Sequence, residues 1–172
     1  MMNDRFKYRV KFEIDRKIEI FDVTNLDIEG GQVFFKRDDG QDYNIGIDCE
    51  GVKLIQCTGL KDKHGKLIYE GDIVRDLTYL HDVKYVCAFL PIYGGLGLIS
   101  NQDLKDYEFC KENWESYKIN DKVRMLDNRF KLANHGNKLK CFNMNDFKMD
   151  IYEVIGNVYE NPELLSEVEN DT

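Results

Sequence analysis

The segment 56–74 constrains the fold more than any other part of the chain, because turn residues divide it into short apolar runs. Its polar stretch 61–66 predicts a hairpin connection, in which Asp62 favours the start of a type I turn and Gly65 takes a positive φ. A second turn, 70–72, separates this hairpin from the next strand. The segment therefore predicts paired strands of a small barrel-like β core.

The N-terminal third of the chain also has the pattern of β-strands. Residues 6–14 alternate between apolar and charged side chains, as in a strand with one buried face. Turn residues then separate further short runs that are rich in β-branched and aromatic residues. These runs predict strands at 18–23, 32–36, 43–47 and 52–57. A meander is the natural pairing of the first three strands.

The second half of the chain contains two more readable regions. Residues 83–90 predict a strand that Pro91 ends, and the glycine-containing segment 93–99 predicts a turn into its partner strand. Residues 152–159 predict a closing strand, in which a glycine permits a bulge or a close backbone approach. Between them, residues 101–150 are less regular, and we expect one short helix at 103–114.

The segment after the closing strand predicts a short helix. Asn161 is placed to be its N-cap, Pro162 fits the first helical position, and Glu163 is favoured there by the helix dipole.

Composition indicates a compact protein. The chain has 172 residues, of which 42% are hydrophobic and 12% are aromatic, enough for one domain or two small ones. No apolar run approaches the roughly 20 residues of a membrane span, and the first residues lack the hydrophobic core of a signal peptide. We therefore expect a cytoplasmic protein that does not enter a membrane.

No constellation in the sequence predicts catalysis, a cofactor or a metal. The five cysteines are odd in number and form no Cys-x-x-Cys, so we expect small buried side chains at 49, 57, 87, 110 and 141. No two of the three histidines have ligand spacing with a carboxylate or thiolate. An acid pair could form among Asp62, Glu70 and Asp72, but turn chemistry explains the first, and solvation explains the other two.

The net charge of −8 is unevenly distributed. Residues 151–172 hold six acidic residues and no basic one, whereas residues 118–140 hold seven basic and two acidic residues. Basic residues interleaved with aromatic ones suit phosphate contact and base stacking, although a solvated charged loop would have the same composition. The candidate nucleic-acid contacts are Lys122, Arg124, Arg129, Lys131, Lys138 and Lys140.

Two stretches resemble the YopX family of phage and prophage proteins. They read Gln-Cys-Thr-Gly-Leu-Lys-Asp-Lys-His-Gly-Lys from position 56 and Glu-Val-Ile-Gly-Asn-Val-Tyr-Glu-Asn-Pro-Glu-Leu-Leu from position 153. Cys57, His64 and Val158 stand where the family usually has tyrosine, asparagine and isoleucine. The resemblance implies a mainly β protein with an SH3-like barrel in its C-terminal half and no established activity. The structural signature residues are Gly59, Gly65, Gly71, Asp72, Gly156, Asn161 and Pro162.

Pattern and resemblance together give a definite expectation. The fold is mainly β, with an N-terminal β meander in a subdomain at 1–55 and an SH3-like barrel at 56–165. An irregular insertion at 101–150 interrupts the barrel, and residues 166–172 form a disordered acidic tail. The first functional hypothesis is a non-enzymatic module that binds a protein partner or forms a homo-oligomer. Nucleic-acid binding through 118–140 is the alternative, and an enzyme comes third.

Overall fold

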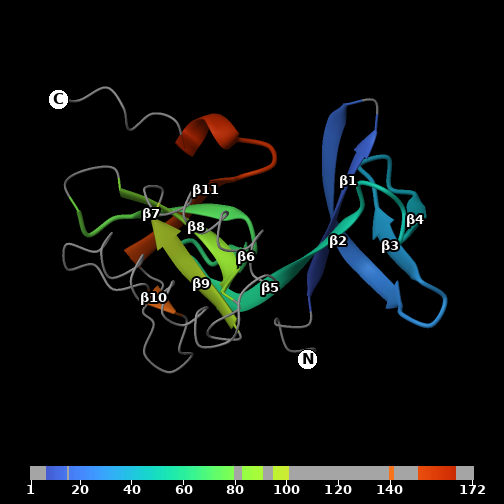
Figure 1. Ribbon diagram of the computed structural model, residues 1–172, viewed down its shortest axis with the longest axis horizontal. Helices are drawn as coiled ribbons and strands as arrows, with labels where there is room; N and C mark the ends of the chain where they lie inside the picture. The colour runs from blue at the N-terminus through green and yellow to red at the C-terminus, as the bar shows by residue number, and fades with distance from the viewer. Residues whose placement is uncertain are drawn as a thin grey trace, which may run out of the picture. The chain divides into compact units, whose positions relative to one another are not determined.

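The computed structural model describes residues 7–14, 16–79, 83–90, 95–100, 140–141 and 151–165 (Figure 1). The chain is mainly β, and it divides into two compact units. The first unit comprises Met1–Lys61 and Gly65–Glu70, and the second comprises Asp62–His64 and Gly71–Thr172. Each unit is built on one antiparallel sheet.

The first unit contains a six-stranded sheet in the order β4-β3-β2-β1-β5-β6. The first four strands follow one another as a meander, and the chain then returns so that β5 pairs with β1. This return leaves β4 at one end of the sheet (Figure 1). The strands are β1 (Tyr8–Ile14), β2 (Lys17–Asp27), β3 (Gln32–Lys36), β4 (Asp42–Gly46), β5 (Lys53–Lys61) and β6 (Leu67–Tyr69).

The core of the first unit follows from period-two alternation along β1 and β3. Val10 and Phe12 on β1 are 0% and 2% exposed, and Val33 and Phe35 on β3 complete the buried cluster. The rings of Phe12 and Phe35 lie 5.2 Å apart. Partly buried side chains from β2, β4, β5 and the turn between β4 and β5 surround this cluster, so one face of the sheet is mainly apolar. They are Phe21, Val23, Leu26, Tyr43, Ile45, Ile47, Val52 and Leu54.

The second unit contains a five-stranded sheet in the order β10-β9-β8-β7-β11. Consecutive residues of β7 and β8 are buried, including the charged residues Asp72, Asp76 and Lys84, so both faces of these strands are covered. Tyr85 and Tyr152 meet edge to face, with ring centroids 6.2 Å apart. The elements are β7 (Asp72–Asp76), β8 (Val83–Leu90), β9 (Gly95–Ser100), β10 (Lys140–Cys141), β11 (Tyr152–Asn157) and the 3-10 helix η5 (Pro162–Leu165).

The mainly β fold predicted from the sequence is confirmed, and most strands lie where the alternation places them. Gly65 adopts φ 81° in the β5–β6 connection, and β11 carries a bulge between Val154 and Gly156. A Cβ at Gly156 would come within 2.7 Å of both the Asn161 side-chain oxygen and the Leu164 side chain. The close approach expected at this glycine is therefore present.

Other expectations differ from the structure or lie outside it. The second sheet runs from β10 to β11 without closing in the residues described here, so the SH3-like barrel remains a prediction. The short helix expected at 103–114 and the tail at 166–172 fall outside the described residues. Within the expected irregular insertion at 101–150, β10 forms a short strand that pairs with β9.

Asn161 is used differently from an ordinary helix N-cap. The helix begins at Pro162, as expected, but it is a single 3-10 turn. The Asn161 side-chain oxygen accepts a hydrogen bond from the Asn157 N–H (3.4 Å), and the Leu164 N–H donates to the Asn161 backbone carbonyl (3.1 Å). The side chain of Asn161 thus ties the helix to the end of β11.

Candidate functional site

The candidate site is the outer edge of β4, and its geometry follows from the pairing of β4 with β3. Two backbone hydrogen bonds flank this pair: Ile47 N–H to Gly31 oxygen (2.9 Å) and Arg37 N–H to Gln41 oxygen (3.2 Å). Both join residues that continue the β3–β4 register, in which hydrogen-bonded and non-bonded pairs alternate. The bonds to β3 therefore come from Tyr43 and Ile45.

The same alternation turns the backbone groups of Asp42, Asn44 and Gly46 away from β3. In the described part of the chain, no strand pairs with this outer edge, where the Gly46 carbonyl accepts a turn bond from Cys49 N–H (3.2 Å). Asp42 and Asn44 are exposed, whereas Tyr43 and Ile45 lie partly buried against the core cluster. The β4 edge, defined as Asp42–Gly46, is thus an open edge with one polar and one apolar face.

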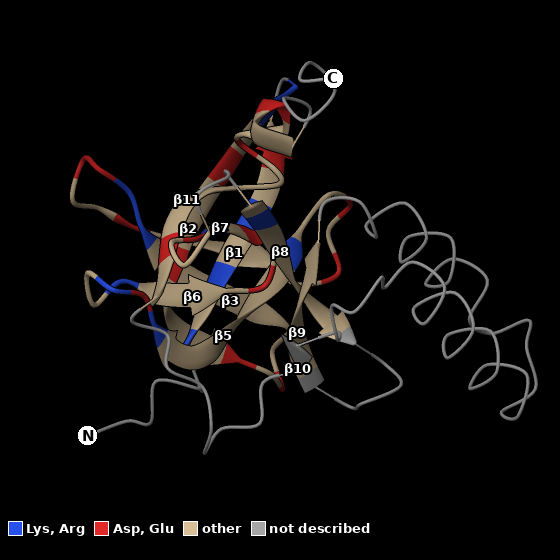
Figure 2. Cartoon of the chain, turned by 90° about the vertical axis from the view of Figure 1, so that its left-hand side faces the viewer, with Lys and Arg blue, Asp and Glu red and all other residues tan. Residues whose placement is uncertain are grey.

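Charge distinguishes the β4 edge from the rest of the sheet. Basic and acidic positions are interspersed over the described strands and turns (Figure 2). From position 38 to 50, however, the chain holds five acidic residues and no basic one: Asp38, Asp39, Asp42, Asp48 and Glu50. All five are exposed. The edge and its flanking turns therefore present negative charge to solvent.

The turn before β4 is fixed by Asp39. Its carboxylate accepts hydrogen bonds from the Gln41 N–H (2.9 Å) and from the Tyr43 hydroxyl (2.7 Å). The bond from the Gln41 backbone, followed by the one from Tyr43, lowers the pKa of Asp39, and the pKa of Tyr43 is raised mainly by its bond to Asp39. Asp39 therefore stays ionised, and the turn holds Tyr43 at the start of the strand.

The end strand of the other sheet is closed, which makes the open β4 edge stand out. On the outer side of β11, the Tyr152 carbonyl accepts a bond from Lys63 N–H (3.0 Å), and the Val154 N–H donates to the Asp62 carboxylate (3.0 Å). Further along, Asn161 bonds both the N–H and the carbonyl of Asn157. Side chains and turn backbone here replace a neighbouring strand, which protects the edge from pairing with another chain.

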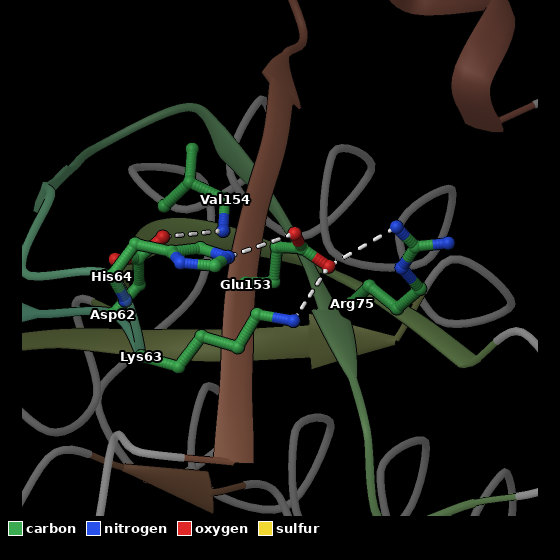
Figure 3. A network of polar contacts seen from close by, with 6 residues as sticks. All are labelled: Asp62, Lys63, His64, Arg75, Glu153 and Val154. Carbon is green, nitrogen blue, oxygen red and sulfur yellow. Dashed lines mark hydrogen bonds and ion pairs between the residues drawn. The ribbon is translucent and has the colours of Figure 1, made fainter.

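A cluster of charges surrounds Glu153 beside this closed edge (Figure 3). The Glu153 carboxylate lies 3.2 Å from His64 Nε2, 3.3 Å from Lys63 Nζ and 3.1 Å from Arg75 Nη2. The hydrogen bond from His64 is the largest cause that lowers the pKa of Glu153, followed by that from Lys63. One carboxylate thus holds the hairpin tip and β7 against β11, which is a structural use of these charges.

The sequence candidates for nucleic-acid contact are not brought together by the described structure. Lys122, Arg124, Arg129, Lys131 and Lys138 lie outside the described residues, and only the backbone of Lys140 is placed, in β10. Of the histidines, His64 lies in the described part, where it is exposed and contacts Glu153. The nucleic-acid hypothesis therefore stays a prediction from the basic and aromatic composition of the sequence.

The carboxylates weighed as an acid pair have separate structural uses. Glu70 pairs with Lys53 Nζ at 3.1 Å, and Asp62 uses both carboxylate oxygens to accept backbone bonds. The expectation that solvation explains Asp72 is wrong, because Asp72 is 3% exposed. Turn chemistry explains only one of the two hydrogen bonds that the Asp62 carboxylate accepts, because its second oxygen accepts from the Val154 N–H on β11.

The cysteine expectation holds for two of the three described thiols. Cys57 and Cys87 are buried at 1% and 0% exposure, as expected for small apolar side chains. Cys49 is exposed, so the expectation of burial is wrong there, because it lies in the turn after β4 rather than on a strand.

Among the residues described, no group of three or more histidine, cysteine or acidic side chains could hold a metal ion. Among the described residues, no helix could span a bilayer.

Comparison with known proteins places the chain. The sequence profile described as "YopX protein" matches residues 7–166, nearly the whole chain. The chain belongs to the YopX family. A solved structure, protein EF1440 from Enterococcus faecalis, is similar to it, with 23% identity, a TM-score of 0.49 and coverage of 92% of this chain and 96% of that one. None of the curated proteins compared with the chain matches it.

Within this family, the sequence signature and the candidate site are different parts of the molecule. Gly65, Asp62 and Asn161 belong to the two family stretches, and they build turns or close the β11 edge. The β4 edge lies outside both stretches, so the resemblance did not indicate it. The acidic run at 38–50 was visible in the sequence, but it gains meaning only once the sheet order makes β4 an end strand.

Proposed function

We propose that the protein is a non-enzymatic interaction module, encoded by a phage or prophage and active in the cytoplasm of the bacterial host. It receives an extended strand from a protein partner, or from a second copy, at the β4 edge. The observation that carries the proposal is the outward direction of the backbone groups of Asp42, Asn44 and Gly46.

Strand addition uses this kind of surface. An extended segment that pairs with an open edge gains main-chain hydrogen bonds, while alternate side chains give selectivity. Proteins usually blunt their edges when no partner is intended, with charges, bulges or covering segments. The β11 edge is blunted in this way by Asp62, Lys63 and Asn161. In the described residues, the β4 edge carries only charges, which do not cover its backbone.

In the described residues, the other end strands of the two sheets, β6 and β10, offer a partner less edge for pairing. Ile68 and Tyr69 on β6 are buried, at 0% and 3% exposure, and β10 contributes two residues. The family supports the non-enzymatic part of the proposal, since its signature residues Gly65 and Asn161 serve a turn and the closure of the β11 edge in this chain. The phage origin and the cytoplasmic location rest on the resemblance of the two family stretches.

The test is a proline at Asn44. Because the Asn44 N–H points away from β3, proline removes an outward donor and crowds the edge while the β3–β4 ladder keeps its bonds. Asn44→Thr is the matched control, because threonine keeps the N–H and favours a strand.

Both variants and the parent chain are compared by size-exclusion chromatography with light scattering, and by capture of partners from host lysate. The proposal expects a complex or oligomer that Asn44→Thr retains and Asn44→Pro loses. A strictly monomeric chain whose captured proteins are the same in all three versions would contradict it.

A further inference from the structure

We infer that the strand received at the β4 edge alternates basic and apolar side chains, and that it comes from a different protein. This inference rests on the proposed function and names the chemistry of the partner. It follows from the two faces of β4, because each residue of an added strand lies beside a β4 residue on the same face.

The polar face of the edge selects basic side chains. Asp42 and Asn44 are exposed on this face, and the flanking turns hold four further exposed acidic residues, Asp38, Asp39, Asp48 and Glu50, of which Asp39 accepts a hydrogen bond from the Tyr43 hydroxyl. Lys36 lies opposite Asp42 on β3, and Arg37, which also pairs with Glu19, acts on Asp39, so the five exposed acidic residues of 38–50 still outnumber these two basic ones. Cross-strand pairs of opposite charge stabilise a sheet, whereas like charges directly opposite destabilise it.

The other face of the edge selects apolar side chains. Tyr43 and Ile45 are partly buried at the border of the core cluster, and the Tyr43 ring stacks on Phe35 with centroids 6.1 Å apart. An added strand would extend this apolar surface by one row, so its residues beside Tyr43 and Ile45 gain by burial. A period of two, basic then apolar, is the pattern that satisfies both faces.

The same charges argue against a second copy of β4 as the occupant. Pairing two β4 edges would bring two acidic runs of the same sequence, 38–50, alongside each other. Like-charge repulsion would then oppose the hydrogen bonds gained. A basic segment removes this conflict and is also steered toward the edge by long-range attraction.

The experiment uses synthetic peptides of about nine residues, close to the upper length of ordinary strands. The basic probe is Lys-Val-Arg-Val-Lys-Val-Arg-Val-Lys, and the control is Glu-Val-Asp-Val-Glu-Val-Asp-Val-Glu. Each carries a fluorophore, and its anisotropy is titrated with the full chain at roughly 50 mM and 300 mM salt.

We expect the basic peptide to bind and the acidic peptide to bind at least about tenfold more weakly. Asn44→Pro should weaken binding of the basic peptide by about tenfold or more, while Asn44→Thr should bind it as tightly as the parent chain does. Asp42→Asn should weaken it by about two- to fivefold, and Asp22→Asn, which makes the same charge change on β2, should have no effect. Should Asn44→Pro fail to fold by circular dichroism, Asp42→Pro replaces it, because the Asp42 N–H also points outward.

The outcomes separate the inference from the proposed function. If Asn44→Pro blocks both peptides and these bind equally in the parent chain, the basic partner is refuted and strand addition survives. If Asn44→Pro leaves the basic peptide bound as tightly as before, strand addition at β4 is refuted as well. A dimer that Asn44→Pro abolishes, without peptide binding, would assign the edge to a second copy and overturn the inference.

Discussion

Replacement of Asp62 by alanine removes a carboxylate that bonds two backbone groups in the second unit. Its oxygens accept from His64 N–H (2.9 Å) and Val154 N–H (3.0 Å), and the residue is 6% exposed. The Val154 N–H lies on the outer side of β11, where Asp62 takes the place of a neighbouring strand.

The magnitude follows from these two bonds. A hydrogen bond to a charged acceptor contributes about 1.5–3 kcal/mol, and a buried donor left without a partner costs about 1–3 kcal/mol. The bond to His64 lies in an exposed turn, where water can replace it at little cost. We therefore expect Asp62→Ala to lower the free energy of unfolding by about 3 kcal/mol.

Urea unfolding followed by circular dichroism measures this loss. With a slope of about 1–3 kcal/mol/M, the midpoint should fall by about 1–3 M. Asp39→Ala is the matched control, because Asp39 also bonds one backbone N–H and one further donor, but in full solvent. Its midpoint should move far less. Equal shifts for the two variants would refute the reasoning that Asp62 closes the β11 edge.

Three further predictions concern Gly156, Glu153 and the basic stretch 118–140. Gly156→Ala should destabilise the second unit by about 1–3 kcal/mol in the same urea assay, because the new Cβ would meet Asn161 and Leu164. Gly40→Ala, at a residue where φ is 78° and the space is open, should lower the free energy of unfolding by about 1 kcal/mol. A larger loss for Gly40→Ala than for Gly156→Ala would contradict the packing argument. The pKa of Glu153 is lowered in the folded state, so the stabilising contribution of Glu153 is present above the ordinary value of 4.5 and is lost as the pH falls below that value. Glu153→Gln should flatten this acid dependence of the unfolding midpoint. An unchanged pH profile in the variant would contradict the role given to Glu153. If the basic stretch 118–140 contacts nucleic acid, the chain should bind short DNA or RNA at roughly 50 mM salt, and no binding at that salt would eliminate the hypothesis.

Local chemistry made the strands predictable. The alternation in 6–14 and the short apolar runs after it locate β1 to β4 within a few residues, because one buried face imposes a period of two. The glycine in 152–159 likewise permits a bulge or a close backbone approach, and the β7–β11 register contains a bulge there.

Pairings between distant residues could not be predicted in the same way. The return of β5 to β1, which makes β4 an end strand, depends on which apolar faces pack together rather than on any turn residue. The second role of Asp62 depends on Val154, a residue 92 positions away. Asp72 was assigned to solvent because its neighbours resemble an ordinary turn, and only the fold buries it.

The exchange rates of individual amide hydrogens on β4, followed by NMR, test the central claim most directly. In the free protein, Tyr43 and Ile45 should exchange slowly because they donate to β3, whereas Asn44 and Gly46 should exchange fast. Addition of the basic peptide should then slow Asn44 and Gly46 selectively. Equal protection of all four amides in the free protein would contradict the account, because the edge would already be occupied.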